Sequence, residues 1–215
     1  MAAGGCNPAA WDAVIFDYGG VLCYAPAQED VARFAASSGL DEATFLKLYA
    51  ETRDYYGRAA AGYSAHWQRV AQAAGTTISE AAVKDFIEKE SGLWTRPNEE
   101  TLAMAQEVKR AGGKIAILSN MTFDLLDVLR TKFDWLGIFD VTIWSCEEGC
   151  AKPDESIYRK CLTALGCDPR RALFFDDRAC NVEGARQLGI EAHVFESAEL
   201  ARAVVERGLQ LRVRP

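Results

Sequence analysis

The sequence predicts an α/β fold, in which a parallel sheet is covered by helices on both faces and a helical segment follows the first strand. Short apolar runs that resemble buried strands alternate with helical patterns. Polar residues end three of these runs, and residues 24–93 contain no convincing strand. Alternation of strands and helices is typical of parallel sheets, because each parallel connection needs a crossover that is usually a helix.

The strand candidates are short and apolar. The clearest are AVIFD (13–17), KIAILSN (114–120) and ALFFDD (172–177), and VTIW (141–144) and EAHVF (191–195) are weaker. Helical patterns are expected over 98–111, 123–133, 154–166, 179–188 and 197–208.

Residues 24–93 break this alternation. Four helical patterns fit there, over 27–37, 41–56, 64–74 and 79–91. Asp41 and Ser79 are suitable N-caps for two of them. We therefore expect a core domain of residues 1–23 and 94–215 and an inserted helical cap of residues 24–93.

Composition excludes several classes of partner. The chain has 215 residues and a net charge of -7, with a pI of about 5.0, so broad binding to nucleic acid or to anionic membranes is not expected. No apolar run approaches the ~18 residues of a membrane span, and the first ten residues lack the features of a signal peptide. The seven cysteines are irregularly spaced, which favours reduced thiols in a cytoplasmic protein. A monomer or a homodimer is expected.

Polar side chains at the ends of three strands mark the candidate site. They are Asp17, the pair Ser119-Asn120 and the pair Asp176-Asp177. Ligands of parallel sheets bind beyond the carboxyl ends of the strands. Neighbouring carboxylates raise each other's pKa unless a cation neutralises them, and Mg²⁺ prefers oxygen ligands. A metal site is favoured, with capping of the following helix by Asp176 and Asp177 as the alternative.

Other residues near these ends suit an anionic ligand. The Gly19-Gly20 turn could bring backbone N–H groups to an anion and a carbonyl to a metal, or be a plain turn. Ser119 and Asn120 would face an anion at a helix N-terminus, or Ser119 would cap that helix. Lys152, in the turn CAKPD, would compensate charge and hold a phosphoryl oxygen, or be a surface lysine.

Together these residues resemble the haloacid dehalogenase-like superfamily. The four motifs are FDYGGVL (16–22), LSN (118–120), AKPD (151–154) and FFDDRACNVEGARQLGI (174–190). The resemblance extends from about Asp12 to Val194 and implies a Rossmann-like core, with the insert similar to the helical C1 cap of subfamily I. The glycine-bearing first motif, the SIY that follows KPD and the FFDD…NVEGA segment resemble bacterial α-D-glucose-1-phosphate phosphatases.

The resemblance implies a nucleophile and a metal cofactor. Asp17 would attack phosphorus and form an aspartyl-phosphate. Mg²⁺ would be held by Asp17, the Gly19 carbonyl and Asp177, with Asp176 as a further ligand or as a supporting partner.

The resemblance also implies how the phosphoryl group is held. Ser119 and Lys152 would bind it, and Asn181 would orient Asp17 or Lys152. One departure concerns Gly19, because many phosphatases of the family carry an acid there that protonates the leaving group. Loss of such help typically costs about 10²–10⁴-fold in rate, although the family's glucose-1-phosphate phosphatases share this glycine.

Three functions remain open. The first is a Mg²⁺-dependent phosphatase acting on a small phosphorylated metabolite such as a sugar phosphate. The second is a haloacid dehalogenase, against which the paired acids Asp176 and Asp177 argue. The third is a non-catalytic protein that binds a phospholigand or a protein partner, for which Gly19 is the best support.

The cap is expected to choose the substrate, because it would cover the mouth of the pocket. Its polar candidates are Arg53, Asp54, Tyr55, Tyr56, Arg58 and His66. A surface or half-buried position is the alternative for His66, and exposure to solvent is the alternative for the two arginines.

Overall fold

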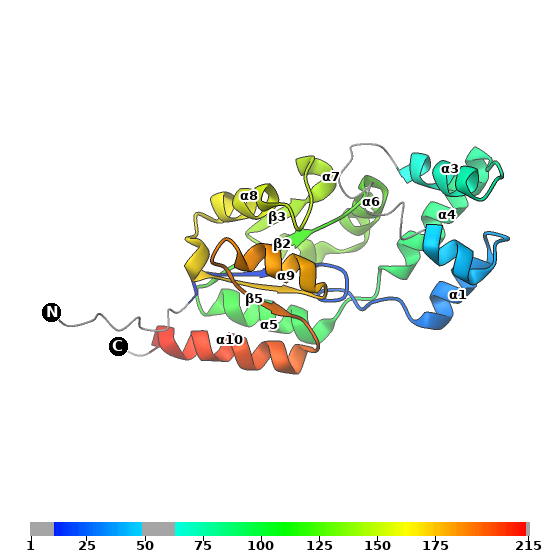
Figure 1. The fold of residues 1–215 in the computed structure, drawn as a ribbon. Coiled ribbons are helices and arrows are strands. Elements are labelled where there is room, and N and C mark those ends of the chain that lie inside the picture. The colour runs from blue at the N-terminus through cyan, green and yellow to red at the C-terminus, as the bar shows by residue number, and fades with distance from the viewer. Residues whose placement is uncertain (1–10, 49–62, 214–215) are drawn as a thin grey trace.

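A five-stranded parallel sheet forms the centre of the protein (Figure 1). The structure is a computed structural model and describes residues 11–48 and 63–213. The strands are β1 (Ala13–Phe16), β2 (Lys114–Ser119), β3 (Val141–Trp144), β4 (Ala172–Asp176) and β5 (Glu191–Val194). The predicted α/β fold is confirmed, and both weaker strand candidates are strands.

Helices connect the strands at nearly all the expected places. They are α1 (Gln28–Ala36), α3 (Tyr63–Ala73), α4 (Glu80–Leu93), α5 (Glu99–Arg110), α6 (Phe123–Lys132), α7 (Ser145–Glu148), α8 (Glu155–Leu165), α9 (Ala179–Arg186) and α10 (Ala198–Val213). Two short 3₁₀ helices, η1 (Asp134–Ile138) and η2 (Pro169–Arg171), and the single turn of α7 were not expected from the sequence. Such short elements carry too few residues for a hydrophobic period.

Helices cover both faces of the sheet, and the alternation of side chains in β1 shows how. Ala13 and Ile15 pack against residues of α8 and α9. Val14 and Phe16 point the other way and share a cluster with residues of α5, α6 and α10. Each face therefore has its own apolar core, which is why the strands read as continuous apolar runs.

The order of the strands places the polar strand ends beside one another. The sheet order is β3-β2-β1-β4-β5, so β1 pairs with β2 on one side and with β4 on the other. The chain moves outward from β1 to β3 and then returns to β4, which makes the β1–β4 boundary a topological switch point. The three strands that end in polar residues are therefore neighbours.

Helix ends follow the capping residues of the sequence. The Asn98 side chain accepts a hydrogen bond of 3.3 Å from Thr101 N at the start of α5. Gly112 lies just beyond its end with φ 80. The predicted N-caps Asp41 and Ser79 accept hydrogen bonds of 3.0 and 3.2 Å from Thr44 N and Ala82 N.

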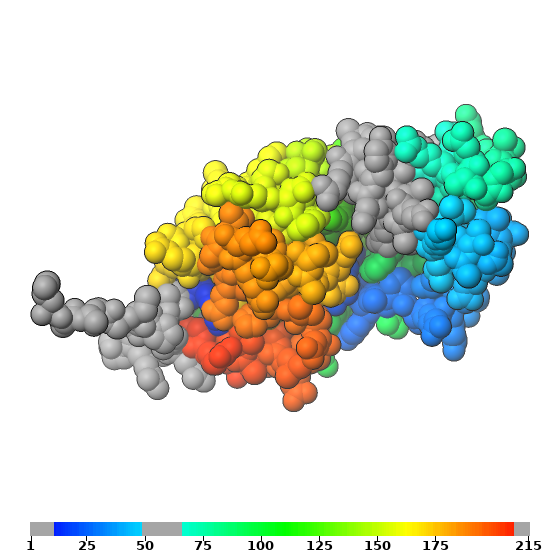
Figure 2. All heavy atoms as spheres, viewed as in Figure 1, coloured from blue at the N-terminus to red at the C-terminus, as the bar shows by residue number. Residues whose placement is uncertain are grey.

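The helices between β1 and β2 have a hydrophobic cluster of their own. Its buried members are Phe34, Ala35, Phe45, Trp67, Val70, Val83 and Phe86. In Figure 2 these helices, coloured blue to cyan, lie at the opposite end of the view from the red part of α10. Residues 42–48 are helical, and the rest of the helix predicted over 41–56 lies outside the described residues. The exact division at residues 24 and 93 stays a prediction.

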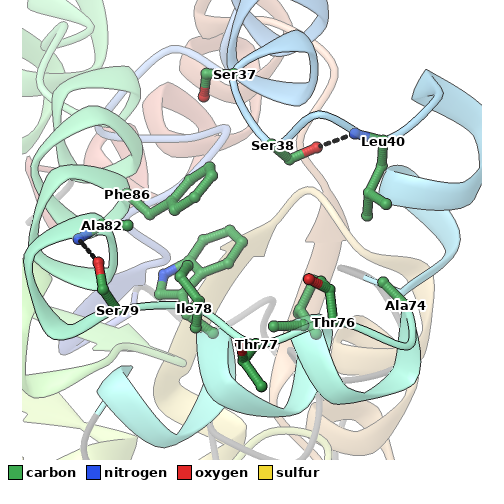
Figure 3. Close-up of a pocket in the computed structure, with 13 residues that line it drawn as sticks. Ser37, Ser38, Leu40, Ala74, Thr76, Thr77, Ile78, Ser79, Ala82 and Phe86 are labelled. Atoms are coloured by element: carbon green, nitrogen blue, oxygen red, sulfur yellow. Dashed lines mark hydrogen bonds between the residues drawn. The ribbon is translucent and has the colours of Figure 1, made fainter.

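A cavity of about 560 Å³ lies within this helical segment (Figure 3). Its lining combines apolar side chains, such as Leu40, Ile78 and Phe86, with five serine or threonine residues. Among the described residues, none of the predicted site residues lines it. The cavity is therefore separate from the polar strand ends.

Six of the seven cysteines lie in the described residues. The six cysteines there are free, and three of them are buried. Within the same ranges, no helix has the length and apolar composition that crossing a membrane would require.

Candidate active site

The carboxyl edge of the sheet brings a buried lysine between two buried aspartates. Lys152 Nζ lies 2.9 Å from Asp17 Oδ1 and 2.6 Å from Asp176 Oδ2. The Asp17 backbone N–H also donates to Phe175 O at 2.9 Å, which ties the end of β1 to the end of β4. The lysine that follows α7 in sequence is therefore not a surface residue.

Asp176 is held on both of its carboxylate oxygens. Oδ2 accepts from Lys152 Nζ at 2.6 Å, and Oδ1 accepts from Asn181 Nδ2 and from Arg178 N, each at 2.9 Å. Asn181 was expected to orient Asp17 or Lys152, and this role stays a prediction, because Asn181 reaches Lys152 only through Asp176. Its direct hydrogen-bond partner is Asp176. The reason is that Asn181 lies in the first turn of α9, five residues after Asp176, where its amide turns back onto the end of β4.

Asn120 also differs from the expectation that its amide faces an anion. Its Nδ2 donates to Lys152 O at 2.9 Å, and its Oδ1 accepts from Lys152 N at 2.8 Å. The amide thus binds the backbone of Lys152 through both polar atoms, as a peptide group in a sheet would. In this structure the Asn120 amide is directed at the backbone of Lys152, so it can position the lysine.

Ser145 is a supporting residue that the sequence did not indicate. It is fully buried, accepts from Met121 N at 2.9 Å and donates to Met121 O at 3.3 Å. These bonds fix the loop that follows β2 and its terminal Ser119. A serine between Trp144 and Cys146 has no local pattern that would mark this role.

The two glycines of the turn after β1 have different surroundings. Gly20 has φ +76, and a Cβ there would lie 2.7 Å from Asp177 Oδ2. Only glycine therefore fits beside that carboxylate. Gly19 has no positive φ, and a Cβ there would lie 3.1 Å from a ring atom of Trp94.

Burial dominates the electrostatics of the site. It raises the pKa of Asp17 from 3.8 to about 7, against the lowering effect of Lys152 and of hydrogen bonds from Lys152 and Ser119. Burial also raises the pKa of Asp177, and the neighbouring Asp176 adds to the rise. For Lys152, burial acts to lower the pKa, but the carboxylates of Asp17 and Asp176 raise it above its ordinary value. The single positive charge of Lys152 therefore does not balance the negative charge of the aspartates at this edge.

The three aspartates could hold a metal ion. Asp17, Asp176 and Asp177 each offer one oxygen, and these oxygens lie within 4.8 Å of one another. In the described ranges, Lys152 is the one cationic side chain that forms a salt bridge with any of the three. A divalent cation would remove the remaining excess of negative charge, and an all-oxygen donor set suits Mg²⁺.

Of the cap candidates, His66 is the one that lies in the described residues. Arg53, Asp54, Tyr55, Tyr56 and Arg58 lie outside the described residues. His66 is fully buried, and its ring packs edge-on against Trp67 at 4.8 Å between centroids. The surface or half-buried position considered for His66 is therefore wrong, because the apolar face of α3 carries it into the core of the helical segment.

Comparison with known proteins identifies the family. A profile of haloacid dehalogenase-like hydrolases matches residues 11–189. A phosphatase of Mycobacterium tuberculosis is 36% identical over 107 residues, which is 48% of each chain. A phosphorylated carbohydrates phosphatase of Thermotoga maritima is 32% identical over 94 residues, which is 43% of each chain. The chain thus aligns with less than half the length of these relatives.

A solved structure supports the fold. A HAD family enzyme of Bacteroides thetaiotaomicron, crystallised with magnesium and inorganic phosphate, has a TM-score of 0.68 at 19% identity. The match covers 86% of this chain and 93% of that one. With the four motifs converging at the carboxyl edge of the sheet, the chain belongs to the haloacid dehalogenase-like hydrolase family.

Proposed function

We propose that this protein is a Mg²⁺-dependent phosphatase that hydrolyses a small phosphomonoester through an aspartyl-phosphate on Asp17. The observation that carries the proposal is the placement of Asp17. Its buried carboxylate ends β1, contacts Lys152 at 2.9 Å and shares a potential metal site with two further aspartates. A nucleophile, a cation for the phosphoryl oxygens and a place for a metal therefore meet at one point.

The reaction takes two displacements. An Asp17 oxygen attacks phosphorus, the P–O bond to the leaving group breaks, and the leaving alkoxide takes a proton from water. A water molecule then attacks the phosphorus of the aspartyl-phosphate, which releases inorganic phosphate and restores the Asp17 carboxylate. Lys152, Ser119 and backbone N–H groups after β1 would hold the phosphoryl oxygens through both steps.

Magnesium fits the oxygen donors at this edge. It would be held by Asp17, Asp177 and the Gly19 carbonyl, and it would supply neutralisation of phosphoryl charge. Asp176 suits the supporting role better than that of a ligand, because Lys152, Asn181 and the Arg178 N–H already occupy its oxygens. Its proposed task is to keep Lys152 in place.

The substrate class is a small phosphorylated metabolite. A sugar phosphate is supported by the relative that acts on phosphorylated carbohydrates and by the motif resemblance to glucose-1-phosphate phosphatases, which stays a prediction. We propose that the helical segment 24–93 is a cap that selects among such esters. The absence of a side chain at Gly19 favours esters with good leaving groups.

A steady-state assay separates the three candidate functions. Purified protein with Mg²⁺ should hydrolyse 4-nitrophenyl phosphate, lose that activity with excess chelator and release no chloride from 2-chloropropionate. Chloride release without metal would support the dehalogenase. Binding of inorganic phosphate without turnover of any ester would support the non-catalytic protein.

Asp17→Asn tests the covalent mechanism. The amide is a poor nucleophile, so we expect turnover to fall by at least about 10³-fold. Thermal unfolding should show a folded protein, because the amide oxygen can still accept from Lys152. Trapping of a phosphorylated Asp17 by rapid acid quench and mass spectrometry should succeed only in the unaltered chain. Equal rates in the two proteins would exclude the aspartyl-phosphate.

A further inference from the structure

Trp94 occupies the junction between the helical segment and the sheet. It follows α4 directly, and Figure 1 shows α4 leading back toward the sheet before α5 begins. Its backbone carbonyl accepts a hydrogen bond of 2.7 Å from the Tyr18 hydroxyl. Tyr18 is buried and adjacent to Asp17, whose Oδ1 accepts from Tyr18 N at 2.6 Å. The position of Trp94 is therefore tied to the proposed nucleophile through one residue.

The ring of Trp94 covers the place where position 19 would carry a side chain. A Cβ on Gly19 would lie 3.1, 3.5 and 3.7 Å from three carbon atoms of the six-membered part of the indole. Both residues are partly exposed, whereas Tyr18 between Asp17 and Gly19 is buried. The flat apolar ring thus borders accessible space next to the turn that follows Asp17.

The geometry of in-line displacement indicates where the leaving group would lie relative to the Trp94 ring. The leaving oxygen departs on the side of phosphorus opposite the attacking Asp17 oxygen. We expect that side to face away from the end of β1, toward the helical segment from which α4 returns. A leaving group held there would lie in the region that Trp94 borders.

We propose that Trp94 is a specificity-determining residue, which favours phosphomonoesters whose leaving group presents a flat ring face. A pyranose or an aryl group could stack on the indole, since dispersion and the aromatic quadrupole favour face contacts. An acyclic alkyl group of similar size offers no such face. This inference rests on the proposed function and narrows its substrate class to ring-bearing esters.

Phosphonates that resist hydrolysis test the proposal by binding alone. Calorimetry on the full chain with Mg²⁺ compares phenylphosphonate with hexylphosphonate, which has the same number of carbon atoms, and with methylphosphonate as a baseline. We expect phenylphosphonate to bind about tenfold more tightly than hexylphosphonate. Trp94→Ala should bring the two within about twofold, while Trp94→Phe keeps most of the preference.

Trp135→Ala is the matched control. Trp135 is also partly buried against the sheet cluster and stacks on Tyr18 with 6.4 Å between ring centroids, but the three atoms nearest to a Cβ at position 19 all belong to Trp94. The control should keep the ring preference, and all variants should bind methylphosphonate alike. Trp94→Leu replaces Trp94→Ala if the smaller residue prevents folding, because leucine keeps apolar volume without a ring.

Three results would overturn the inference. They are equal binding of the two larger phosphonates by the unaltered chain, a preference that survives in Trp94→Ala, and a parallel loss for all three ligands that marks a purely structural residue. If the unaltered chain still hydrolyses 4-nitrophenyl phosphate with Mg²⁺ in the first case, the proposed function stands and the inference alone fails. If neither phosphate nor any phosphonate binds, both fail together.

Discussion

The carboxyl edge of the sheet and the helical segment between β1 and β2 bury different kinds of side chain. The edge buries Lys152 and Asp176, whose side chains are both 0% exposed, with Asp17 beside them. The helical segment buries a set of aromatic rings around Phe34 and Trp67. One region concentrates charge, and the other concentrates apolar surface.

The two regions are therefore expected to contribute differently to catalysis and to the stability of the fold. Burying charges costs free energy that their mutual attraction only partly offsets, so a buried ion pair is weak evidence of a stabilising role. Packed aromatic rings stabilise through burial and dispersion. Substitutions at the edge should therefore change ligand binding and turnover, whereas substitutions in the aromatic cluster should lower the free energy of unfolding without changing ligand binding by the folded protein.

Lys152→Ala should have the largest effect. It leaves Asp17 and Asp176 without their cation, so turnover should fall by at least about 10²-fold. The free energy of unfolding in metal-free buffer should fall by about 3–5 kcal/mol. Urea unfolding and an aryl phosphate assay measure the two quantities.

Added Mg²⁺ should distinguish the loss of turnover in Lys152→Ala from its loss of stability. We expect Mg²⁺ to recover part of the stability of Lys152→Ala, because it neutralises the same carboxylates, but not its activity or its affinity for fluoroberyllate. Lys152→Arg is the control that keeps the charge. Unchanged affinity for fluoroberyllate in Lys152→Ala would remove Lys152 from the phosphoryl site.

Phe34→Ala should lower the stability of the protein and leave ligand binding by the folded protein unchanged. Phe34 meets Phe45, Trp67 and Phe86 at centroid distances of 5.3, 5.5 and 5.8 Å, so its removal leaves a cavity in the cluster. The free energy of unfolding should fall by about 3 kcal/mol, with a smaller loss for Phe34→Leu. Calorimetry should find the affinity of the folded protein for inorganic phosphate and Mg²⁺ unchanged. Loss of phosphate binding in folded Phe34→Ala would show that the two regions are coupled.

Gly20→Ala should have an intermediate effect at the edge. The positive φ of Gly20 costs an alanine about 1–2 kcal/mol, and the new methyl group would displace Asp177 from its position. Mg²⁺ affinity, measured by calorimetry, should fall by about tenfold or more. Gly19→Ala is the control, because its φ is ordinary and its Cβ would meet Trp94 instead. Equal Mg²⁺ affinities in the two variants would separate Asp177 from the metal site.

The sequence predicted the features that depend on local patterns. Apolar runs marked all five strands, and each of the three polar strand ends reached the same edge of the sheet. Both Asp41 and Ser79 cap helices as their residue types indicate. These features could be predicted because one segment of the chain determines each of them, and parallel pairing then aligns their ends.

The sequence could not supply the partners of individual polar groups. Asn120 binds the backbone of Lys152, 32 residues away, and Trp94 covers Gly19, 75 residues away. His66 resembled a surface residue and is buried, because its environment depends on how the helices pack. Side-chain partners of this kind depend on tertiary contacts that hydrophobic periodicity does not encode.

The pH dependence of stability gives a further test of the difference between the two regions. In the metal-free protein, burial raises the pKa of Asp17 from 3.8 to about 7. Between these values the folded state binds the proton more tightly than the unfolded state, so this carboxyl stabilises the fold at low pH. That contribution is lost as the pH rises through about 7.

Asp17→Asn isolates this contribution, because an amide does not titrate. As the pH rises from 4 to 8, the Tm of the unaltered chain should decline relative to that of Asp17→Asn by roughly 10 °C, because one pKa unit corresponds to about 1.4 kcal/mol and each kcal/mol shifts the Tm by about 2–4 °C. Mg²⁺ should reduce the decline, since it binds the ionised carboxylate. Phe34→Ala, which lies in the aromatic cluster, should follow the unaltered chain in slope at a lower Tm. A constant difference between the unaltered chain and Asp17→Asn would mean that Lys152 fully compensates the burial of Asp17, and the edge would then be as neutral as the aromatic cluster.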